Sequence, residues 1–146
     1  MALIDRHVDA LLLTALTHLQ PYLDDLVVIG GVANALYRHH ELAASVALGS
    51  IGTTDIDIAA ANPVRPVGRR PIAELLVDAG LEAQIHPAHA PPIMKFTRSN
   101  DPNVELEFLC PLVGSWRTRG GEKRLAAEIQ PGVTAQQLRY LDLLLF

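Results

Sequence analysis

The sequence predicts a single α/β (α+β) domain over residues 1–146, with a short mixed β-sheet flanked by helices. Short aliphatic runs alternate with segments whose apolar residues recur every three or four positions, and Gly or Pro separates them. A length of 146 residues suits one domain with its own core. Hydrophobic residues make up 49% and charged residues 19%, which excludes a disordered chain.

The first third of the chain predicts a helix, a strand and a second helix. Residues 8–19 place their apolar side chains on one stripe, which is typical of an amphipathic helix. Residues 26–29 form an aliphatic run too short for a helix, so we expect a buried strand there. The pair Gly30-Gly31 interrupts the strand, and a short helix over residues 32–39 follows.

The middle of the chain adds a strand and a helix. Residues 41–52 fit either a helix or a strand. Residues 54–59 alternate polar and apolar side chains, as a strand with one buried face does. A basic loop with two prolines covers residues 62–70. Residues 71–80 then begin with Pro and end with Gly, as many helices do.

The last part predicts three strands and a terminal helix. We expect a strand over residues 81–86 and an antiparallel hairpin of strands 93–97 and 104–109, joined by a turn-rich connection. A threonine suited to capping precedes a final helix predicted over residues 135–146. Because residues 138–146 are densely apolar, we expect either a homodimer interface or, in preference, a chain that continues into a further C-terminal part.

Charge and cysteine content exclude several classes of protein. The 12 Lys and Arg against 16 Asp and Glu give a formal charge of −4, which argues against binding nucleic acid by bulk charge alone. Cys110 is the only cysteine, so a disulfide framework and a multi-cysteine zinc site are excluded. No apolar run reaches the ~20 residues of a membrane helix, and the N-terminus lacks a secretory-signal pattern. We therefore expect a soluble, cytoplasmic protein.

Two aspartates are the first candidate functional residues. Asp55 and Asp57 lie two positions apart on the predicted strand, so both carboxylates project from the same face, about 7 Å apart. Two anions so close repel unless a cation lies between them, and oxygen ligands select a hard ion such as Mg²⁺. An isolated Asp-x-Asp is more often a solvated strand face, so the residues on either side must decide whether it is a metal site.

Features on both sides of the aspartates support a site. Gly30-Gly31 lets a ligand approach the backbone closely, and the following helix start offers N–H groups to phosphate; a tight turn is the alternative. Glu105 and Glu107 share one face of a predicted strand, so Glu107 can join the aspartates as a third carboxylate. The alternative is that both glutamates line the exposed face of an edge strand.

Three segments together resemble the nucleotidyltransferase superfamily: VIGGVA at 28–33, TTDIDI at 53–58 and ELEFLCPL at 105–112. In detail they resemble the bacterial AbiEii-like branch, which includes nucleotidyltransferase toxins of toxin–antitoxin systems. The resemblance covers roughly residues 26–112, and LRYLDLL at 138–144 also fits. It departs from the usual pattern at Gly31, where many members have Ser, and at Glu107, where Asp is usual. The spacing from Gly31 to Asp55 also exceeds that of minimal members, so an inserted element lies between them.

The resemblance implies transfer of a nucleoside monophosphate from an NTP to an acceptor hydroxyl, with release of pyrophosphate. Asp55, Asp57 and Glu107 would be the catalytic metal ligands, around two Mg²⁺ ions when NTP is bound. The implied nucleotide-binding positions are Gly30, Gly31 and Thr54. Lys95, on the strand predicted to pair with that of Glu107, could also contact the nucleotide phosphate; a solvent-facing charge is the alternative. RNA, protein and small molecules stay open as acceptors. The alternative function is a catalytically inactive domain of the same fold that serves binding or regulation.

Other residues with reactive or charged side chains have weaker interpretations. Trp116 with Arg117 and Arg119 could stack a nucleic-acid base, although a lone tryptophan is more often a packing anchor. The arginines of the loop over residues 62–70 could contact RNA, but a solubilising loop is favoured. Cys110 follows a predicted strand and is interpreted as a buried apolar residue rather than a nucleophile.

Overall fold

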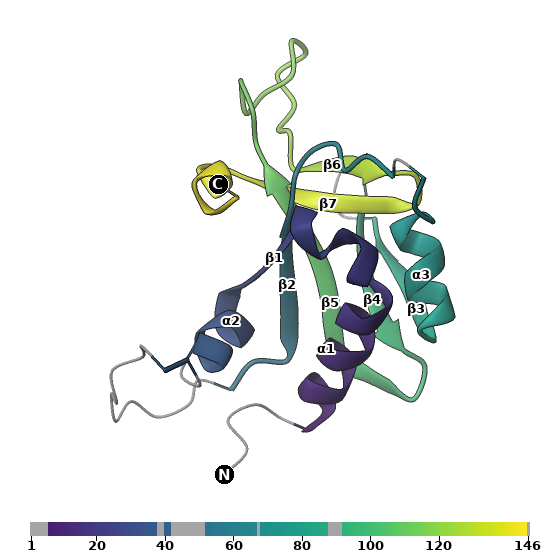
Figure 1. Cartoon of the computed structure of the whole chain (residues 1–146). Helices are drawn as coiled ribbons and strands as arrows, with labels where there is room; N and C mark the ends of the chain where they lie inside the picture. Colours follow the sequence, from purple (N-terminus) through teal and green to yellow (C-terminus); the bar gives the residue numbers. More distant parts are fainter. Residues whose placement is uncertain (1–5, 38–39, 42–51, 67, 88–91, 146) are drawn as a thin grey trace.

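The computed structural model describes most of the chain (Figure 1). The described residues are 6–37, 40–41, 52–66, 68–87 and 92–145. The α-helices are α1 (Arg6–His18), α2 (Gly30–Tyr37) and α3 (Ile72–Asp78), and the 3-10 helices are η1 (Gln20–Asp25) and η2 (Leu141–Leu144). The strands are β1 (Leu26–Ile29), β2 (Asp55–Ala60), β3 (Leu81–His86), β4 (Ile93–Arg98), β5 (Asp101–Pro111), β6 (Ala126–Gln130) and β7 (Val133–Leu138). The segment 41–52, predicted as helix or strand, falls almost wholly outside the described residues.

The described strands form one seven-stranded mixed sheet, which confirms the predicted fold class. Strands β1-β2-β5-β4-β3 are hydrogen-bonded in that order, and β7 pairs with both β5 and β6. The pairs β2–β5 and β5–β7 are parallel, whereas β1–β2, β3–β4, β4–β5 and β6–β7 are antiparallel. Strand β5 is therefore internal: β2 lies along one edge, and β4 and then β7 lie along the other.

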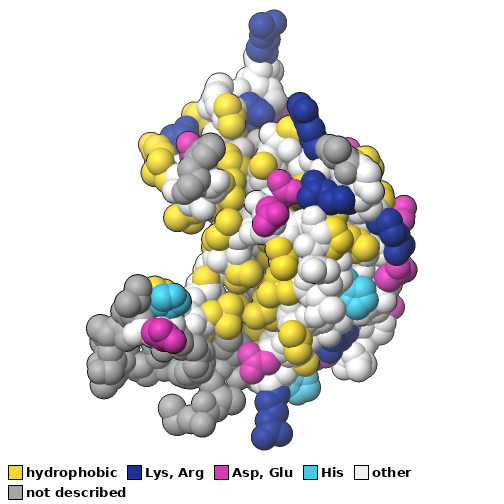
Figure 2. Space-filling view, in the orientation of Figure 1, with side chains coloured by type: hydrophobic (Ala, Val, Ile, Leu, Met, Phe, Trp, Pro, Cys, Tyr) yellow, Lys and Arg dark blue, Asp and Glu magenta, His cyan; other side chains and the backbone are white. Residues whose placement is uncertain are grey.

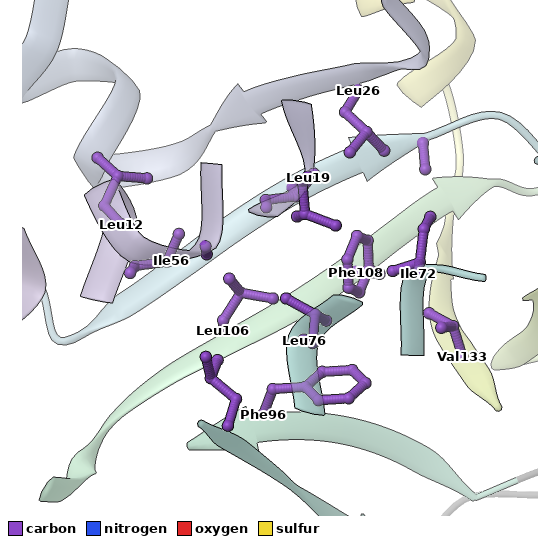
Figure 3. Packing of buried hydrophobic residues seen from close by; sticks show 14 of the residues in the cluster. Leu12, Leu19, Leu26, Ile56, Ile72, Leu76, Phe96, Leu106, Phe108 and Val133 are labelled. Carbon is purple, nitrogen blue, oxygen red and sulfur yellow. The ribbon is translucent and has the colours of Figure 1, made fainter. Parts of the chain in front are cut away.

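Helices α1 and α3 cover one face of the sheet and enclose the core (Figure 1). Ile56 of β2 and Leu106 and Phe108 of β5 point to this face (Figure 3), and Ile58 belongs to the same cluster. All four side chains are fully buried. Burying each such side chain contributes about 1.5–3 kcal/mol. Because side chains alternate along a strand, Asp55, Asp57 and Ala59 of β2 and Glu105, Glu107 and Leu109 of β5 point to the opposite face.

Most locally patterned predictions are confirmed. The helices predicted over residues 8–19, 32–39 and 71–80 correspond to α1, α2 and α3. The strand over 81–86 is β3, and the predicted hairpin is the antiparallel pair β4–β5. No described helix is long and apolar enough to cross a membrane.

The final helix predicted over residues 135–146 is wrong. Residues 126–130 and 133–138 are the antiparallel strands β6 and β7, and only a short 3-10 helix, η2, follows. Along β7, Val133, Ala135 and Gln137 are buried while the residues between them are half-buried, which is the period of a strand. Strand β7 pairs with Leu109–Pro111 of β5, beyond the part of β5 that β4 covers. This tertiary pairing outweighs the capping signal of Thr134.

The C-terminal segment packs on the sheet face opposite α1 and α3. Leu141 is buried against Ala59 of β2 and Leu109 of β5, with Leu138 and Leu145 packed alongside. Leu143 and Leu144 stay exposed. The apolar C-terminal residues are thus partly used within the domain, while the expected homodimer or C-terminal continuation stays a prediction.

Candidate active site

Parallel pairing of β2 and β5 brings four carboxylates together. Asp55 lies opposite Glu105, and Asp57 lies opposite Glu107. All four side chains project from the face away from α1 and α3, on neighbouring strands about 4.8 Å apart. We call these four residues the acid row. The sequence prediction that position 107 shares a face with positions 55 and 57 is confirmed, and the edge-strand alternative is wrong because β5 is internal.

The glycine pair lies directly against the acid row. Ile29 pairs with Asp57 across β1–β2, so α2 begins beside that aspartate. Gly30 has a φ of +71°, and a Cβ built there would lie 2.3 Å from Oδ2 of Asp57. A side chain at this position would overlap the carboxylate, so only glycine permits the approach. The start of α2 and the Asp57 carboxylate therefore meet at one point of the surface.

The space beside Gly31 is occupied by Thr53. A Cβ built on Gly31 would lie 3.0 Å from Cβ and 3.3 Å from Oγ1 of Thr53. The Thr53 hydroxyl donates to the backbone oxygen of Asp55 at 3.2 Å. Thr53 thus fills the volume that a serine at position 31 would need, which gives a physical reason for glycine there. The neighbouring Thr54 is exposed, and its backbone oxygen accepts the N–H of Glu105 at 3.2 Å.

Lys95 supplies a positive charge to the acid row. It pairs with Glu107 across β4–β5, and its Nζ lies 2.5 Å from Oε2 of Glu105 and 3.6 Å from Oε2 of Glu107. Partial burial acts to lower the pKa of Lys95, but the hydrogen bond to Glu105 and the negative charges of Glu107, Glu105 and Asp55 outweigh it, and the pKa is raised. Lys95, predicted to bind nucleotide, therefore neutralises the two glutamates here.

The surroundings of Glu107 raise the pKa of its carboxyl. Burial raises its pKa, the charge of Lys95 lowers it, and the hydrogen bond and charge of Asp57, with the charge of Asp55, raise it; the net pKa is raised. Its side chain is only 17% exposed. Glu107 thus shares a partly dehydrated, crowded anionic environment with Asp57.

The carboxylates of the acid row are suitable ligands for a hard metal cation, but the row already has a positive charge beside it, the ammonium of Lys95. Carboxylate oxygens are the ligands that Mg²⁺ prefers. Within the described ranges, however, no three His, Cys, Asp or Glu side chains are grouped so that they could hold a metal ion. Repulsion among the acids is relieved instead by the Lys95 ammonium. The repulsion among the clustered carboxylates can therefore be relieved in this chain either by a divalent cation or by Lys95.

A hollow borders the acid row on the side of β3 and β4. It has a volume of about 290 Å³, and its lining includes Gln84, His86, Thr97, Pro102 and Glu105. Glu105 is thus shared between the ion pair with Lys95 and the wall of this hollow. The acid row is open to a small ligand at this end.

The comparison with known protein families decides the assignment. A family model described as nucleotidyltransferase matches residues 7–146. The chain belongs to the nucleotidyltransferase family. No curated protein and no solved structure matches it significantly. In this nucleotidyltransferase the match extends beyond the segments that carried the sequence resemblance, to include α1, β6 and β7.

The sequence does not assign two of the residues at the candidate site. The strand period places Glu105 on the same face as Glu107, but its pairing with Lys95 depends on the register of β4 and β5. Thr53 belongs to the TTDIDI segment, but its contact with Gly31 arises only on folding. Two arginines of the loop over 62–70 have acidic partners: Arg69 pairs with Asp25, and Arg70 pairs with Glu74 and Asp78.

Proposed function

We propose that this nucleotidyltransferase is an active, Mg²⁺-dependent enzyme of the AbiEii-like branch, the branch that includes toxins of toxin–antitoxin systems. It would transfer a nucleoside monophosphate from an NTP to an acceptor hydroxyl and release pyrophosphate. The observation that carries the proposal is the meeting of Asp57, Glu107 and Gly30 at one point of the sheet face. The AbiEii-like assignment rests on the motif segments alone.

Each residue has a distinct role in the proposed reaction. Asp55 and Asp57 would hold Mg²⁺, and Glu107 would join them. When bound, Mg²⁺ would supply positive charge that screens the phosphates and lowers the pKa of the acceptor hydroxyl. Gly30 and Gly31 have no side chains at the start of α2, so its backbone N–H groups could receive an anionic phosphate beside Asp57 and Thr53. Thr54 and Lys95 flank the same face and would contact the nucleotide.

A second candidate function follows from one contact. Because Lys95 already neutralises Glu105 and Glu107, the acid row is electrostatically satisfied without a metal ion. That arrangement favours a catalytically inactive domain that keeps the fold and serves binding or regulation. The two candidates differ in whether Mg²⁺ and NTP bind productively at Asp55 and Asp57.

The deciding experiment measures label transfer from each of the four α-labelled NTPs in cell extract, with Mg²⁺ or with EDTA. We expect a labelled product that needs Mg²⁺ and is lost in Asp57→Asn. The change Asp24→Asn removes an exposed carboxylate of η1 in the same way and serves as the matched control. Thermal denaturation verifies that both variants fold.

Two outcomes would contradict active transfer. Near-wild-type transfer by Asp57→Asn would show that the carboxylate is not a metal ligand. Absence of transfer by the folded wild-type protein with every NTP would favour the inactive domain instead.

A further inference from the structure

A basic hairpin projects from the sheet at the C-terminal end of β5. Residues 112–125 extend away from the rest of the domain (top of Figure 1), and residues 113–123 are all exposed. The segment is ordered by its own hydrogen bonds: the Thr118 N–H donates to the Glu122 oxygen at 2.8 Å, and the Arg124 N–H donates to the Trp116 oxygen at 2.9 Å. Its side chains are therefore presented on a defined scaffold.

Positive charge is concentrated on this hairpin although the whole chain is acidic. Residues 112–125 contain four Lys and Arg and one Glu, a net charge of +3, against −4 for the full chain. The same end of the molecule carries dark-blue Lys and Arg side chains in Figure 2. In the described part of the chain, none of these four cations takes part in an ion pair, whereas Arg69, Arg70 and Lys95 all do. Arg117 and Arg124 do donate to backbone oxygens within the hairpin. Arg119 and Lys123 are therefore the cations most available to an anionic partner.

An exposed tryptophan lies at the centre of the cations. The guanidinium of Arg117 lies 4.3 Å from the ring centroid of Trp116, that of Arg139 lies 5.7 Å away, and Nζ of Lys123 lies 5.9 Å away. The indole is 40% exposed, so it is not a buried packing anchor. Aromatic faces bordered by cations are the usual means of binding unpaired bases together with their phosphates.

A hollow large enough for a nucleotide adjoins the hairpin. It has a volume of about 390 Å³ and is lined by Leu112, Val113, Gly114, Arg139, Tyr140 and Asp142. Tyr140 is 74% exposed and offers a second aromatic ring. Arg139 belongs both to this hollow and to the surroundings of Trp116, so the hollow and the cation cluster form one continuous surface.

This surface leads toward the acid row. Glu107 and Pro111 lie four residues apart on β5, which corresponds to about 13 Å along the strand. Leu141 and Leu138, which flank Arg139 and Tyr140, pack against Ala59 and Leu109 on the face that carries the acid row. A nucleic-acid strand bound to the hairpin can therefore extend one of its ends to the acid row.

We propose that residues 112–125, together with Arg139 and Tyr140, bind single-stranded nucleic acid. Arg119 and Lys123 contact phosphates, and Trp116 and Tyr140 stack unpaired bases. The inference deepens the proposed function, because the bound strand would be the acceptor of the transferred nucleotide. In that role it rests on the proposed function. Binding itself requires neither Mg²⁺ nor transfer.

Fluorescence anisotropy of the full chain tests the proposal, with labelled oligouridylate and oligothymidylate of about 15 nucleotides as probes. We expect binding that weakens with salt. The double variant Arg119→Ala/Lys123→Ala should bind at least tenfold more weakly and lower the slope of log K against log salt by about 1.4, at ~0.7 per contact. The double variant Arg6→Ala/Arg65→Ala removes the same charge elsewhere on the surface and should bind as wild type does.

The aromatic contribution is tested separately. Trp116→Ala should weaken binding several-fold at every salt concentration, and Trp116→Phe should restore most of it, because a stacking surface returns. Preference for RNA over DNA, or equal affinity for both, supports the surface. The proposal would be overturned if the two double variants lost the same affinity for the oligonucleotides. It would also be overturned if a duplex bound more tightly than the single strands, or if polyglutamate bound as tightly as they do.

Asp57→Asn separates this inference from the proposed function. It should bind the oligonucleotides as wild type does. Binding without any transfer by the wild type would refute the proposed function and leave the nucleic-acid surface intact. Transfer that persists unchanged in the hairpin variants would overturn the surface as the acceptor site and leave the proposed function intact.

Discussion

Gly30 and Asp57 are in direct contact: a Cβ built on Gly30 would lie 2.3 Å from Oδ2 of Asp57. The contact joins the start of α2 to the acid row, and it also requires the left-handed conformation of Gly30, whose φ is +71°. Any side chain at position 30 must move Asp57 or the start of the helix.

We predict that Gly30→Ala abolishes nucleotide transfer. The left-handed conformation costs an alanine about 1–2 kcal/mol, and displacement of Asp57 adds to that cost. Gly80→Ala is the matched control, because Gly80 has a φ of +78° with open space around its Cβ position. Denaturant unfolding and label transfer measure both variants. Full transfer by Gly30→Ala would show that the position of Asp57 is not critical.

We predict that Lys95→Met lowers stability in EDTA and that Mg²⁺ restores it. Removing the ammonium leaves Glu105 and Glu107 without their cation. Because these side chains are 17–27% exposed, the loss should be modest, about 1 kcal/mol. Thermal denaturation with and without Mg²⁺ measures the effect, and Lys95→Arg, which keeps the charge, is the control. An equal response of wild type and Lys95→Met to Mg²⁺ would contradict competition between lysine and metal.

The parts of the fold that sequence could predict are those with a local pattern. The alternation of residues 54–59 predicted β2 and the shared face of Asp55 and Asp57, and the turn-rich residues between two apolar runs predicted the β4–β5 hairpin. Each of these patterns involves residues close together in the chain, where the period of the side chains fixes the structure.

The parts that sequence could not predict depend on long-range pairing. No pattern among neighbouring residues shows that β5 pairs in parallel with β2. The sequence therefore also allows Glu105 and Glu107 to lie on an edge strand. The contact of Lys95 with Glu105 depends on the β4–β5 register. Strand β7 alternates weakly in sequence, and its pairing with Leu109–Pro111 decides against the helix that Thr134 suggested.

We predict that Gln130→Met lowers the free energy of unfolding by about 2–4 kcal/mol. The buried amide of Gln130 accepts the N–H of Ile72 at 2.7 Å and donates to the backbone oxygen of Val64 at 3.1 Å and to the Tyr22 hydroxyl at 3.3 Å. A methionine of similar shape removes all three bonds and leaves the N–H of Ile72, at the start of α3, without this acceptor. Gln136→Met, at a half-buried position on β7, is the control and should change stability little. Equal effects of the two substitutions in urea unfolding would contradict the prediction.

We predict that Cys110 makes stability fall at alkaline pH. Burial raises the pKa of the Cys110 thiol to about 11, against a smaller opposing effect of Arg124, while the unfolded thiol titrates near ~8.5. As pH rises above ~8.5, the unfolded chain loses its thiol proton while the folded chain keeps it, so unfolding becomes easier until about pH 11.

The measurement compares the free energy of unfolding of wild type and Cys110→Ala between about pH 8 and 10.5. The stability of the wild type relative to the variant should fall by up to about 1.4 kcal/mol per pH unit, because the variant lacks the titrating thiol. Since Cys110 is the only cysteine and is fully buried, a thiol reagent at pH 8 should also label the native protein slowly and the unfolded protein fast. Parallel pH profiles for the two proteins, or rapid labelling of the native state, would show instead that the thiol ionises within the fold.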